Sequence, residues 1–552
     1  MKLVLAQINY TVGDIEGNVQ KILHAYHNVC TDNGLLICSE LALTGYYPQD
    51  LASKESVLKR QDTALRALTA ATKGWACAIV VGYIARNYEA TGKRLFNALA
   101  LLSDGEQIFT YHKRLLPTYN IFDEARHFEP GSNSGVFQYK GTLLGFLICE
   151  DAWARTDTHT YVDDPVDELK VHQLDLLIII NASPNNLGKM KERMAIVRNL
   201  AVKVCAPVVY VNQVGGNDEL VFDGGSFVVN SAGRLAYQMA SFKEQIGEIE
   251  LQDIAHKEVD FNALSDNDVM FNQTVLGIRD YVHKCAFSKV VIGSSGGIDS
   301  ALTLAICCAA IGGENVTAIT MPSEYSSPGS VNDSQLLCQN LGVRLLTCPI
   351  TQEFQLAVQQ FELMTGVKPS SLTQENMQAR IRGRILMEYS NHFSALVVST
   401  GNKSEMSVGY ATLYGDMNGG INLLGDLYKM DVYALAKFIN KRAGKAIIPD
   451  SIIEKQPSAE LSKDQADSDS LPEYPLLDAI LKLYIEGDVL DAQERQHCEK
   501  IIAQFGATGQ EIAAIHKMVD SAEFKRRQAP PIIRVRKRSF GMGRWLPVAA
   551  KY

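Results

Sequence analysis

The sequence contains no apolar run that approaches the roughly 20 residues needed to cross a bilayer. Its first residues predict a short buried strand, and the polar Asn9 comes too early for the apolar region of a signal peptide. The eleven cysteines include no C-x-x-C pair and no Cys/His cluster at zinc spacing. Neither a disulfide framework nor a structural metal is therefore indicated, and we expect a cytoplasmic protein without a membrane partner.

An excess of basic residues is also missing. The formal net charge is −9, whereas nucleic acids and anionic lipids usually require a basic face. We therefore expect no nucleic-acid partner. Basic residues gather only near the end of the chain, where a solvated tail is the simplest prediction. They are Lys525, Arg526, Arg527, Arg534, Arg536, Lys537 and Arg538.

The chain is too long for a single hydrophobic core. It has 552 residues, and cores stop growing at about 250–300 residues. Short apolar runs alternate with longer helical patterns, which predicts an α/β fold with strands covered on both faces. The runs expected to be strands are 35–38, 78–82, 143–149, 174–181, 207–212, 289–292, 316–320, 343–348 and 395–400.

This alternation is interrupted by a polar stretch before a new amphipathic helix at about 269–283. We predict a first domain at 1–255, a linker at 256–266 and a second domain at 267–552. Segments rich in small and polar residues predict loops or lids. They are 323–333, 411–425 and 457–470. The last is the most polar, and it is either a disordered insertion or a lid over a site.

One candidate site combines a thiol, a carboxylate and an amine. Cys149 ends the apolar run Leu-Leu-Gly-Phe-Leu-Ile, Glu40 follows another strand-like run, and Lys113 lies in Tyr-His-Lys-Arg-Leu-Leu-Pro. Each alone is most simply an inert thiol or a surface charge. In this order and context they resemble the Glu-Lys-Cys triad of the nitrilase superfamily, over roughly residues 1–250. The resemblance implies an α-β-β-α sandwich.

Amide hydrolysis explains these residue types. A thiolate attacks the carbonyl, a base takes the thiol proton and returns it to departing ammonia, and a cation stabilises the oxyanion. Cys149, Glu40 and Lys113 fit these roles in turn. Resemblance to the glutaminase domains of NAD synthetases implies that the substrate is glutamine. Its expected ligands are Tyr119, Glu150, Ser183 and Arg193, with Lys189 as the alternative to Arg193 for the α-carboxylate.

A second candidate site is a glycine turn between a strand and a helix, at residues 295–300, Ser-Gly-Gly-Ile-Asp-Ser. Such turns bind anions through backbone N–H groups and the helix dipole, but an ordinary connection would look similar. Neither G-x-x-x-x-G-K-[ST] nor G-x-G-x-x-G is present. The segment resembles the loop of N-type ATP pyrophosphatases, which implies a Rossmann-like domain with a parallel sheet. It also implies ATP contacts from Ser295, Gly296, Gly297, Asp299 and Ser300, and Mg²⁺ on Asp299.

Three further segments, 399–416, 425–433 and 453–461, resemble signature segments of NAD synthetases, with Gln456 and Glu460 departing mildly from the commonest wording. The resemblance extends from about residue 267 to the end. It assigns roles as follows: Glu405 shares Mg²⁺ with Asp299, Thr400 and Lys429 contact ATP, Asn376 and Arg380 hold the dinucleotide deamido-NAD, and Asp416 approaches its nicotinate end. A solvated helical face is the alternative for 376–384.

Together the two resemblances predict a glutamine-dependent NAD synthetase. Such an enzyme uses ATP to adenylate the nicotinate carboxylate of deamido-NAD and replaces AMP with ammonia from glutamine, which passes internally between the sites. The family implies a homo-oligomer with dimerised synthetase domains. Three alternatives stay open: another glutamine-fed adenylating amide ligase, a nitrilase-type amidase with a regulatory nucleotide-binding domain, and a non-enzymatic scaffold.

Overall fold

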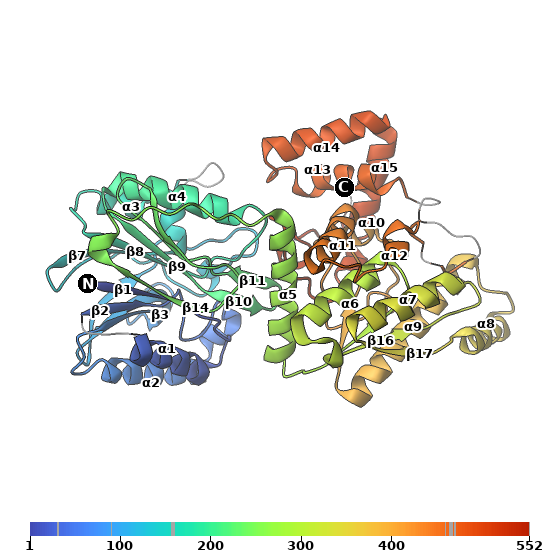
Figure 1. Ribbon diagram of the computed structural model, residues 1–552, viewed down its shortest axis with the longest axis horizontal. Coiled ribbons are helices and arrows are strands. Elements are labelled where there is room, and N and C mark those ends of the chain that lie inside the picture. Colours follow the sequence, from blue (N-terminus) through green and yellow to red (C-terminus); the bar gives the residue numbers. More distant parts are fainter. Residues whose placement is uncertain are drawn as a thin grey trace. The chain divides into compact units, whose positions relative to one another are not determined.

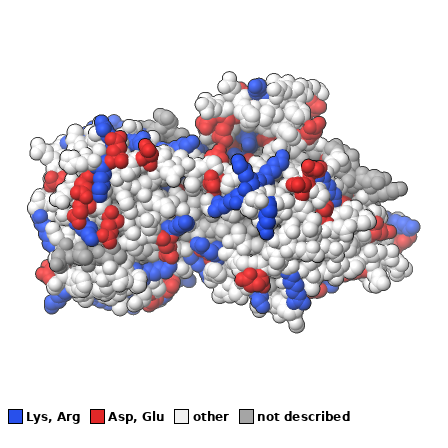
Figure 2. Space-filling view, viewed as in Figure 1, with Lys and Arg blue, Asp and Glu red and all other residues white. Residues whose placement is uncertain are grey.

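A computed structural model describes residues 1–29, 33–89, 91–155, 161–458, 460–462, 467 and 471–550. The chain divides into two compact units, residues 1–264 and 265–552 (Figure 1). In the described residues no helix is both long and apolar enough to cross a membrane. On the face drawn in Figure 2, Lys and Arg are interspersed with Asp and Glu on both units.

The first unit is an α-β-β-α sandwich, whose described residues form two six-stranded sheets. In order, one sheet contains β14 (Gln245–Glu250), β1 (Lys2–Gln7), β2 (Gly34–Ile37), β3 (Ala78–Arg86), β4 (Leu95–Ser103) and β5 (Glu106–His112). The other contains β13 (Leu235–Gln238), β12 (Phe227–Val229), β9 (Val208–Asn212), β8 (Leu176–Asn181), β7 (Thr142–Ile148) and β6 (Val136–Tyr139). A short hairpin joins β10 (Val214–Asn217) to β11 (Leu220–Asp223).

Three apolar layers hold this sandwich together. The middle layer lies between the two sheets, and helices α1 (Ile15–Val29) and α2 (Glu55–Ala71) cover the outer face of the first sheet. Helices α3 (Pro165–Leu169) and α4 (Lys189–Val204) cover the second. Because both faces of each sheet are covered, strands such as β8 are buried at every position. β1, β2 and β3 pair in parallel, as do β7, β8 and β9, so their polar C-terminal extensions gather at common sheet edges.

The second unit is built on a parallel sheet in the order β17-β16-β15-β18-β19. Its strands are β15 (Val290–Gly293), β16 (Val316–Thr320), β17 (Arg344–Thr347), β18 (Leu396–Ser399) and β19 (Ile421–Asn422). Its larger helices are α5 (Asp266–Lys284), α6 (Ile298–Ile311), α7 (Pro328–Leu341), α8 (Thr351–Thr365), α9 (Ser371–Phe393) and α11 (Lys429–Ala443). Shorter α10 (Lys403–Val408) and α12 (Asp450–Glu454) flank α11. The chain ends with α13 (Tyr474–Glu486), α14 (Ala492–Phe505), α15 (Gly509–Ser521) and α16 (Glu523–Arg526).

Every apolar run predicted to be a strand is one, and the α/β class is confirmed. The predicted loop at 323–333 is wrong in its second half, where α7 begins at Pro328. A proline at the start and the Ser327 hydroxyl, which accepts the Ser330 N–H, start this helix. Segment 411–425 is irregular apart from β19. Most of the predicted lid at 457–470 lies outside the described residues.

The basic C-terminal run is not the solvated tail that its composition predicts. Arg526, Arg534 and Arg536 are buried. Arg536 pairs with Asp431 at 2.7 Å, and the backbone N–H groups of Val535 and Arg536 both donate to one oxygen of Asp426. Acidic partners about 100 residues upstream therefore neutralise the run inside the unit, which local composition does not reveal.

Cys77 is disulfide-bonded, whereas Cys149 and several other cysteines are free thiols. Cysteine spacing gives no sign of this bond. A disulfide requires two Cα atoms within about 7 Å of each other, and distance along the chain does not report that.

Candidate active sites

The structure brings Glu40, Lys113 and Cys149 together at the carboxyl ends of the sandwich strands. Lys113 Nζ lies 2.7 Å from Glu40 Oε1. The other oxygen of Glu40 accepts the backbone N–H of Ala182 at 2.9 Å. Glu40 and Lys113 are fully buried and Cys149 is 7% exposed. The charges of Glu40 and Lys113 both act on the Cys149 thiol, so the three groups form one electrostatic unit.

Cys149 has a strained backbone at the point where β7 turns into a short helical segment. Its φ is +45°, a value that non-glycine residues seldom adopt and that is concentrated at functional sites. Burial, followed by the negative charge of Glu40, raises the pKa of Cys149 well above its ordinary value. The thiol is therefore protonated at neutral pH and needs a neighbouring base before it can attack.

Glu124 is a member of this cluster that the sequence interpretation missed. Its Oε1 lies 2.8 Å from Lys113 Nζ and accepts the Tyr46 hydroxyl at 2.8 Å. Asn97 donates to Glu40 at 2.7 Å and to Glu124 at 3.3 Å. Burial raises the pKa of Glu124 to about 7. For Lys113, burial lowers the pKa, but the carboxylates of Glu124 and Glu40 outweigh burial and raise it above its ordinary value.

The residues expected to hold glutamine lie around the thiol. Glu150 follows Cys149, and both of its oxygens accept the Tyr119 hydroxyl, at 3.0 and 3.1 Å. Tyr161, which the sequence interpretation missed, donates to Glu150 at 2.9 Å. Ser183 is buried, and its N–H donates to Asn212 at 2.9 Å.

Arg193 does not present an open fork to a ligand. Its side chain is fully buried and pairs with Asp223 at 2.6 Å. Its other donors bind the Ser183 hydroxyl at 3.1 Å and the carbonyls of Ser183 and Pro184 at 2.7 and 3.1 Å. Arg193 thus fixes Ser183 from behind. Lys189 is more accessible, with 20% of its side chain exposed and its ammonium 3.4 Å from Glu192.

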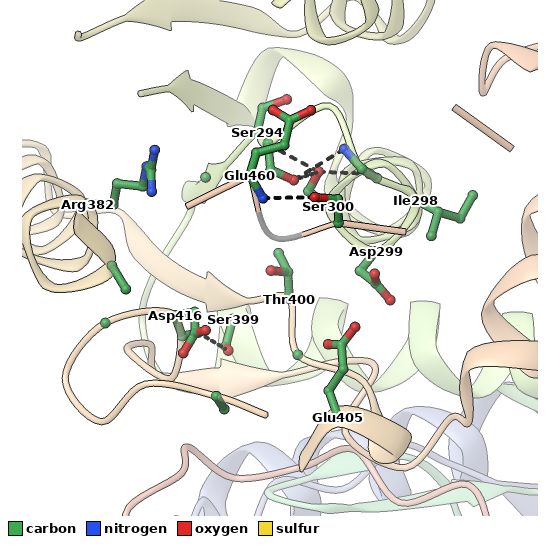
Figure 3. Close-up of a pocket in the computed structure, with 18 of the residues that line it drawn as sticks. Ser294, Ile298, Asp299, Ser300, Arg382, Ser399, Thr400, Glu405, Asp416 and Glu460 are labelled. Carbon is green, nitrogen blue, oxygen red and sulfur yellow. Dashed lines mark hydrogen bonds between the residues drawn. The ribbon is translucent and has the colours of Figure 1, made fainter. Parts of the chain in front are cut away.

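The second site is a cavity of about 300 Å³ at the carboxyl edge of the parallel sheet. It lies between the loops after β15 and β18, where the strand order reverses and α/β proteins commonly bind ligands. Figure 3 shows Asp299, Ser300 and Thr400 at this cavity. All of the expected ATP contacts except Gly296 line it.

Gly296 shapes the loop instead. Its φ is +76°, and a Cβ at this position would lie 2.4 Å from the carbonyl oxygen of Ser330. Only glycine fits there without moving backbone. Ser295 Oγ lies 3.1 Å from Ser300 Oγ and accepts the Gly297 N–H at 3.2 Å, so the turn is held closed by its own hydroxyls.

Asp299 and Glu405 point toward one another across the cavity (Figure 3). Lys429 Nζ lies between them, 2.6 Å from Asp299 and 3.0 Å from Glu405. Asn402 donates to the second oxygen of Asp299 at 2.8 Å. Burial lowers the pKa of Lys429, but Asp299 and Glu405 outweigh burial and raise it above its ordinary value. Lys429 therefore stays charged.

No cluster of three or more potential metal ligands occurs in the described part of the chain. Asp299 and Glu405 nevertheless fit Mg²⁺, which typically takes one or two carboxylates and completes its shell with phosphate oxygens and water. A nucleotide in this cavity would supply those oxygens.

Of the three residues expected to hold the dinucleotide, one lines the cavity and two do not. Asp416 lines the cavity, where its side chain is exposed. Asn376 and Arg380, on α9, are not brought to the cavity. Asn376 accepts the Thr412 hydroxyl at 2.7 Å, and Arg380 is exposed. Arg382, two residues further along α9, lines the cavity and was missed.

Glu460 also lines this cavity, although the sequence shows it only as a mild departure from the residue most common at that position of the motif. It accepts hydroxyl hydrogen bonds from Ser327 and Ser330, at 3.0 and 2.7 Å, and pairs with Lys455 at 2.8 Å. Asp467, beside the undescribed residues, lines the cavity and accepts the Tyr474 hydroxyl at 2.8 Å.

Comparison with known proteins identifies this combination of units. The carbon-nitrogen hydrolase family model matches residues 2–257, and the NAD synthase family model matches residues 270–529. The chain is 39% identical to a glutamine-dependent NAD(+) synthetase of Synechocystis sp., over 100% of this chain and 99% of the relative. It is also 39% identical to that of Acinetobacter baylyi, over 99% and 98%. The chain belongs to the glutamine-dependent NAD(+) synthetases.

Solved members of the glutamine-dependent NAD(+) synthetases have the same architecture. The structure from Acinetobacter baumannii, in complex with adenosine diphosphate, is 37% identical, with a TM-score of 0.77 over 99% of this chain and 98% of that one. The Cytophaga hutchinsonii structure, at 19% identity and a TM-score of 0.82 over 100% and 98%, shares the fold. The resemblances inferred from the motifs are confirmed, and the chain is a ligase-type enzyme.

Proposed function

We propose that this chain converts deamido-NAD to NAD, using ATP and ammonia from glutamine, and releases AMP, pyrophosphate and glutamate. The observation that carries the proposal is the presence of two sets of functional groups in one chain: a thiol with its base and cation, and a cavity of about 300 Å³ with two carboxylates and a lysine. In this proposal, residues 1–255 form the glutaminase domain and residues 267–552 the synthetase domain.

In the glutaminase reaction, Cys149 attacks the carboxamide carbon of glutamine while Glu40 takes the thiol proton. The carbon–nitrogen bond then breaks, and Glu40 returns the proton to the departing ammonia. Lys113 stabilises the oxyanion. Water hydrolyses the resulting thioester to glutamate, with Glu40 again as base. The buried pair between Glu40 and Lys113 supports this division of roles, because it fixes the base and the cation at one point.

Glutamine recognition falls to groups around Cys149. Glu150, oriented by Tyr119 and Tyr161, is suited to bind the α-ammonium of glutamine. Ser183 is held by Arg193. Between the two cations considered for the α-carboxylate, the geometry favours Lys189, because the donors of Arg193 bind inside the protein.

In the synthetase reaction, a nicotinate carboxylate oxygen attacks the α-phosphorus of ATP, and pyrophosphate leaves. Ammonia then attacks the activated carboxyl carbon, and AMP leaves. The 295–300 turn is suited to hold the departing pyrophosphate at the N-terminus of α6. Mg²⁺, held by Asp299 and Glu405, would supply charge compensation on the phosphate oxygens. Lys429, charged and buried beside them, adds a fixed positive group, and Thr400 offers a hydroxyl.

In this proposal, the binding of deamido-NAD depends on the assembly of two copies of the chain. Asn376 and Arg380 lie outside the cavity on α9, and exposed apolar side chains occur at the start of α9 and the end of α8. Leu363 and Met364 at the end of α8 are 86% and 76% exposed, and Leu372 at the start of α9 is 66% exposed. Exposed apolar groups of this kind mark protein interfaces. We therefore propose a homo-oligomer in which synthetase domains pair at α8 and α9, so that Asn376 and Arg380 bind deamido-NAD beside a second copy.

The proposal is tested by finding which carboxylate accepts the adenylyl group. Pyrophosphate release should be measured with ATP, Mg²⁺ and ammonium, supplying deamido-NAD, nicotinate mononucleotide or free nicotinate. We expect release that depends on deamido-NAD and yields equal amounts of AMP and NAD. Efficient release with another carboxylate and none with deamido-NAD would assign the site to a different acceptor, and release with none of them would contradict the adenylating function.

A further inference from the structure

Helix α11, which carries Lys429 as its first residue, caps itself only in part: the Asp431 side chain accepts the Tyr428 N–H at 3.0 Å. Tyr428 precedes it and provides no side-chain cap. The first N–H groups of a helix lack partners within the helix. Here two of them bind side chains from elsewhere: Lys429 N–H donates to Ser404 Oγ at 2.9 Å, and Met430 N–H donates to Asp478 Oδ2 at 2.9 Å.

Ser404 and Asp478 are joined to each other, because the Ser404 hydroxyl donates to Asp478 Oδ1. Asp478 is therefore linked to the first two N–H groups of α11. It accepts the Met430 N–H directly, and it is linked to the Lys429 N–H through the Ser404 hydroxyl. Asp478 is 3% exposed and Ser404 is fully buried. A buried carboxylate is costly unless hydrogen bonds and nearby positive charge compensate, and the N-terminus of a helix provides both.

Helix α13, which carries Asp478, also contacts the adenylating site through a second residue, Tyr474. Tyr474 lies four residues earlier on α13 and therefore on the same face. Its hydroxyl lies 3.5 Å from Glu405 Oε1, and the Lys429 ammonium lies 5.0 Å from its ring centre. Helix α13 packs against both α10 and α11, which Figure 1 draws beside it. Helix α13 thus contacts the Lys429 ammonium through the Tyr474 ring and the neighbouring Met430 N–H through Asp478.

We infer that Asp478 is a positioning residue of the adenylating site: through Ser404 and the first amides of α11, it sets where the Lys429 ammonium lies between Asp299 and Glu405. The inference rests on the proposed function and extends it to the C-terminal helices. Asp478 is not among the residues that line the cavity, so in this inference it acts through Lys429. Nothing in the sequence motifs points to it, because it lies 49 residues from Lys429.

The test compares Asp478→Asn with Asp520→Asn in the full-length enzyme. Asp520, on α15, accepts the Tyr484 hydroxyl of α13 at 2.8 and 2.9 Å, so its replacement disturbs the packing of α13 without touching α11. Each variant is assayed for thermal midpoint, for kcat and KM of ATP in pyrophosphate release with ammonium, and again in a Lys429→Met background. We expect Asp478→Asn to lower kcat by about 100-fold, the size of loss that a 1 Å misplacement produces, and Asp520→Asn to leave kcat within about threefold.

The double variants separate positioning from general damage. If Asp478 acts through Lys429, then Asp478→Asn lowers kcat by less than about threefold once Lys429 is methionine, because effects on one unit are not additive. A full second loss, or a parental kcat in the single variant, would overturn the inference. Should Asp478→Asn not fold, Ser404→Ala replaces it, with an expected loss of about tenfold that again vanishes in the Lys429→Met background. Failure of the proposed function would look different, since the parental enzyme would then release no pyrophosphate with deamido-NAD.

Discussion

Lys429 Nζ lies 2.6 Å from Asp299 Oδ2, so the two residues form an ion pair at the place where a metal and a triphosphate would have to be accommodated. Glu405, at 3.0 Å, is the third member. Binding of Mg²⁺ with ATP must therefore redistribute contacts among three groups that already compensate each other. The ammonium holds the two carboxylates near one another before any cation arrives.

This ion pair predicts that replacing a carboxylate and replacing the lysine have different effects on the Mg²⁺ concentration needed for activity. Asp299→Asn and Glu405→Gln remove a carboxylate ligand and should raise the Mg²⁺ concentration for half-maximal pyrophosphate release by about 10–100-fold. Lys429→Met removes the cation that competes for the same carboxylates. It should lower the rate while leaving the Mg²⁺ requirement equal to or below the parental one. A titration of pyrophosphate release against Mg²⁺ at saturating ATP distinguishes the two classes. Equal shifts in all three variants would contradict the assignment of the ligands.

Gly296 provides a test of the phosphate turn. Gly296→Ala forces a Cβ against the Ser330 carbonyl at a φ of +76°, so the turn must open and pyrophosphate release should fall by at least about 100-fold. Gly342, at the end of α7, is a matched control with a φ of +67° and no atom near the added Cβ. Gly342→Ala should cost only the left-handed strain, about 1 kcal/mol of stability, with unchanged activity. Retained activity in Gly296→Ala would show that the turn does not need its present shape.

The pH dependence of glutamine hydrolysis should report Glu124. Burial raises its pKa to about 7, so Glu124 becomes ionised, and able to hold Lys113, as the pH rises through 7. We expect kcat/KM for glutamine to rise over the same range. Glu124→Gln should lower the plateau by about 100-fold and remove this rise. Tyr46→Phe removes a hydrogen bond that lowers the pKa of Glu124, so it should move the rise to higher pH. An identical profile in all three enzymes would exclude Glu124 as its source.

The parts of both sites that sequence predicts share one property. Glu40, Cys149 and the 295–300 turn each follow an apolar run that becomes a buried strand, so local pattern places them at a sheet edge. The resemblance to known families then links them to residues elsewhere in the chain. Lys113 and Lys429 depend on that link, because a lysine in isolation is most simply a surface charge.

The residues that sequence interpretation misses act through contacts between distant segments. Asn97 lies within β4, where its position predicts a structural role, yet it donates to Glu40. Asp478 lies on an amphipathic helix and Asn402 before a short one, without any nearby chemical motif. Arg193 shows the reverse error, because it is predicted to bind the α-carboxylate of glutamine. Its side chain instead points into the protein and forms a buried ion pair with Asp223. In each case the decisive partner is set by tertiary packing.

The most direct test of the account is NAD formation by the parental enzyme and by Cys149→Ala, with ATP, Mg²⁺ and deamido-NAD, supplied with either glutamine or ammonium. We predict that Cys149→Ala forms no NAD from glutamine and keeps most of the parental rate with ammonium, because the thiol serves only to release ammonia. Equal loss with both nitrogen donors, or undiminished use of glutamine, would contradict the division of labour between the two sites.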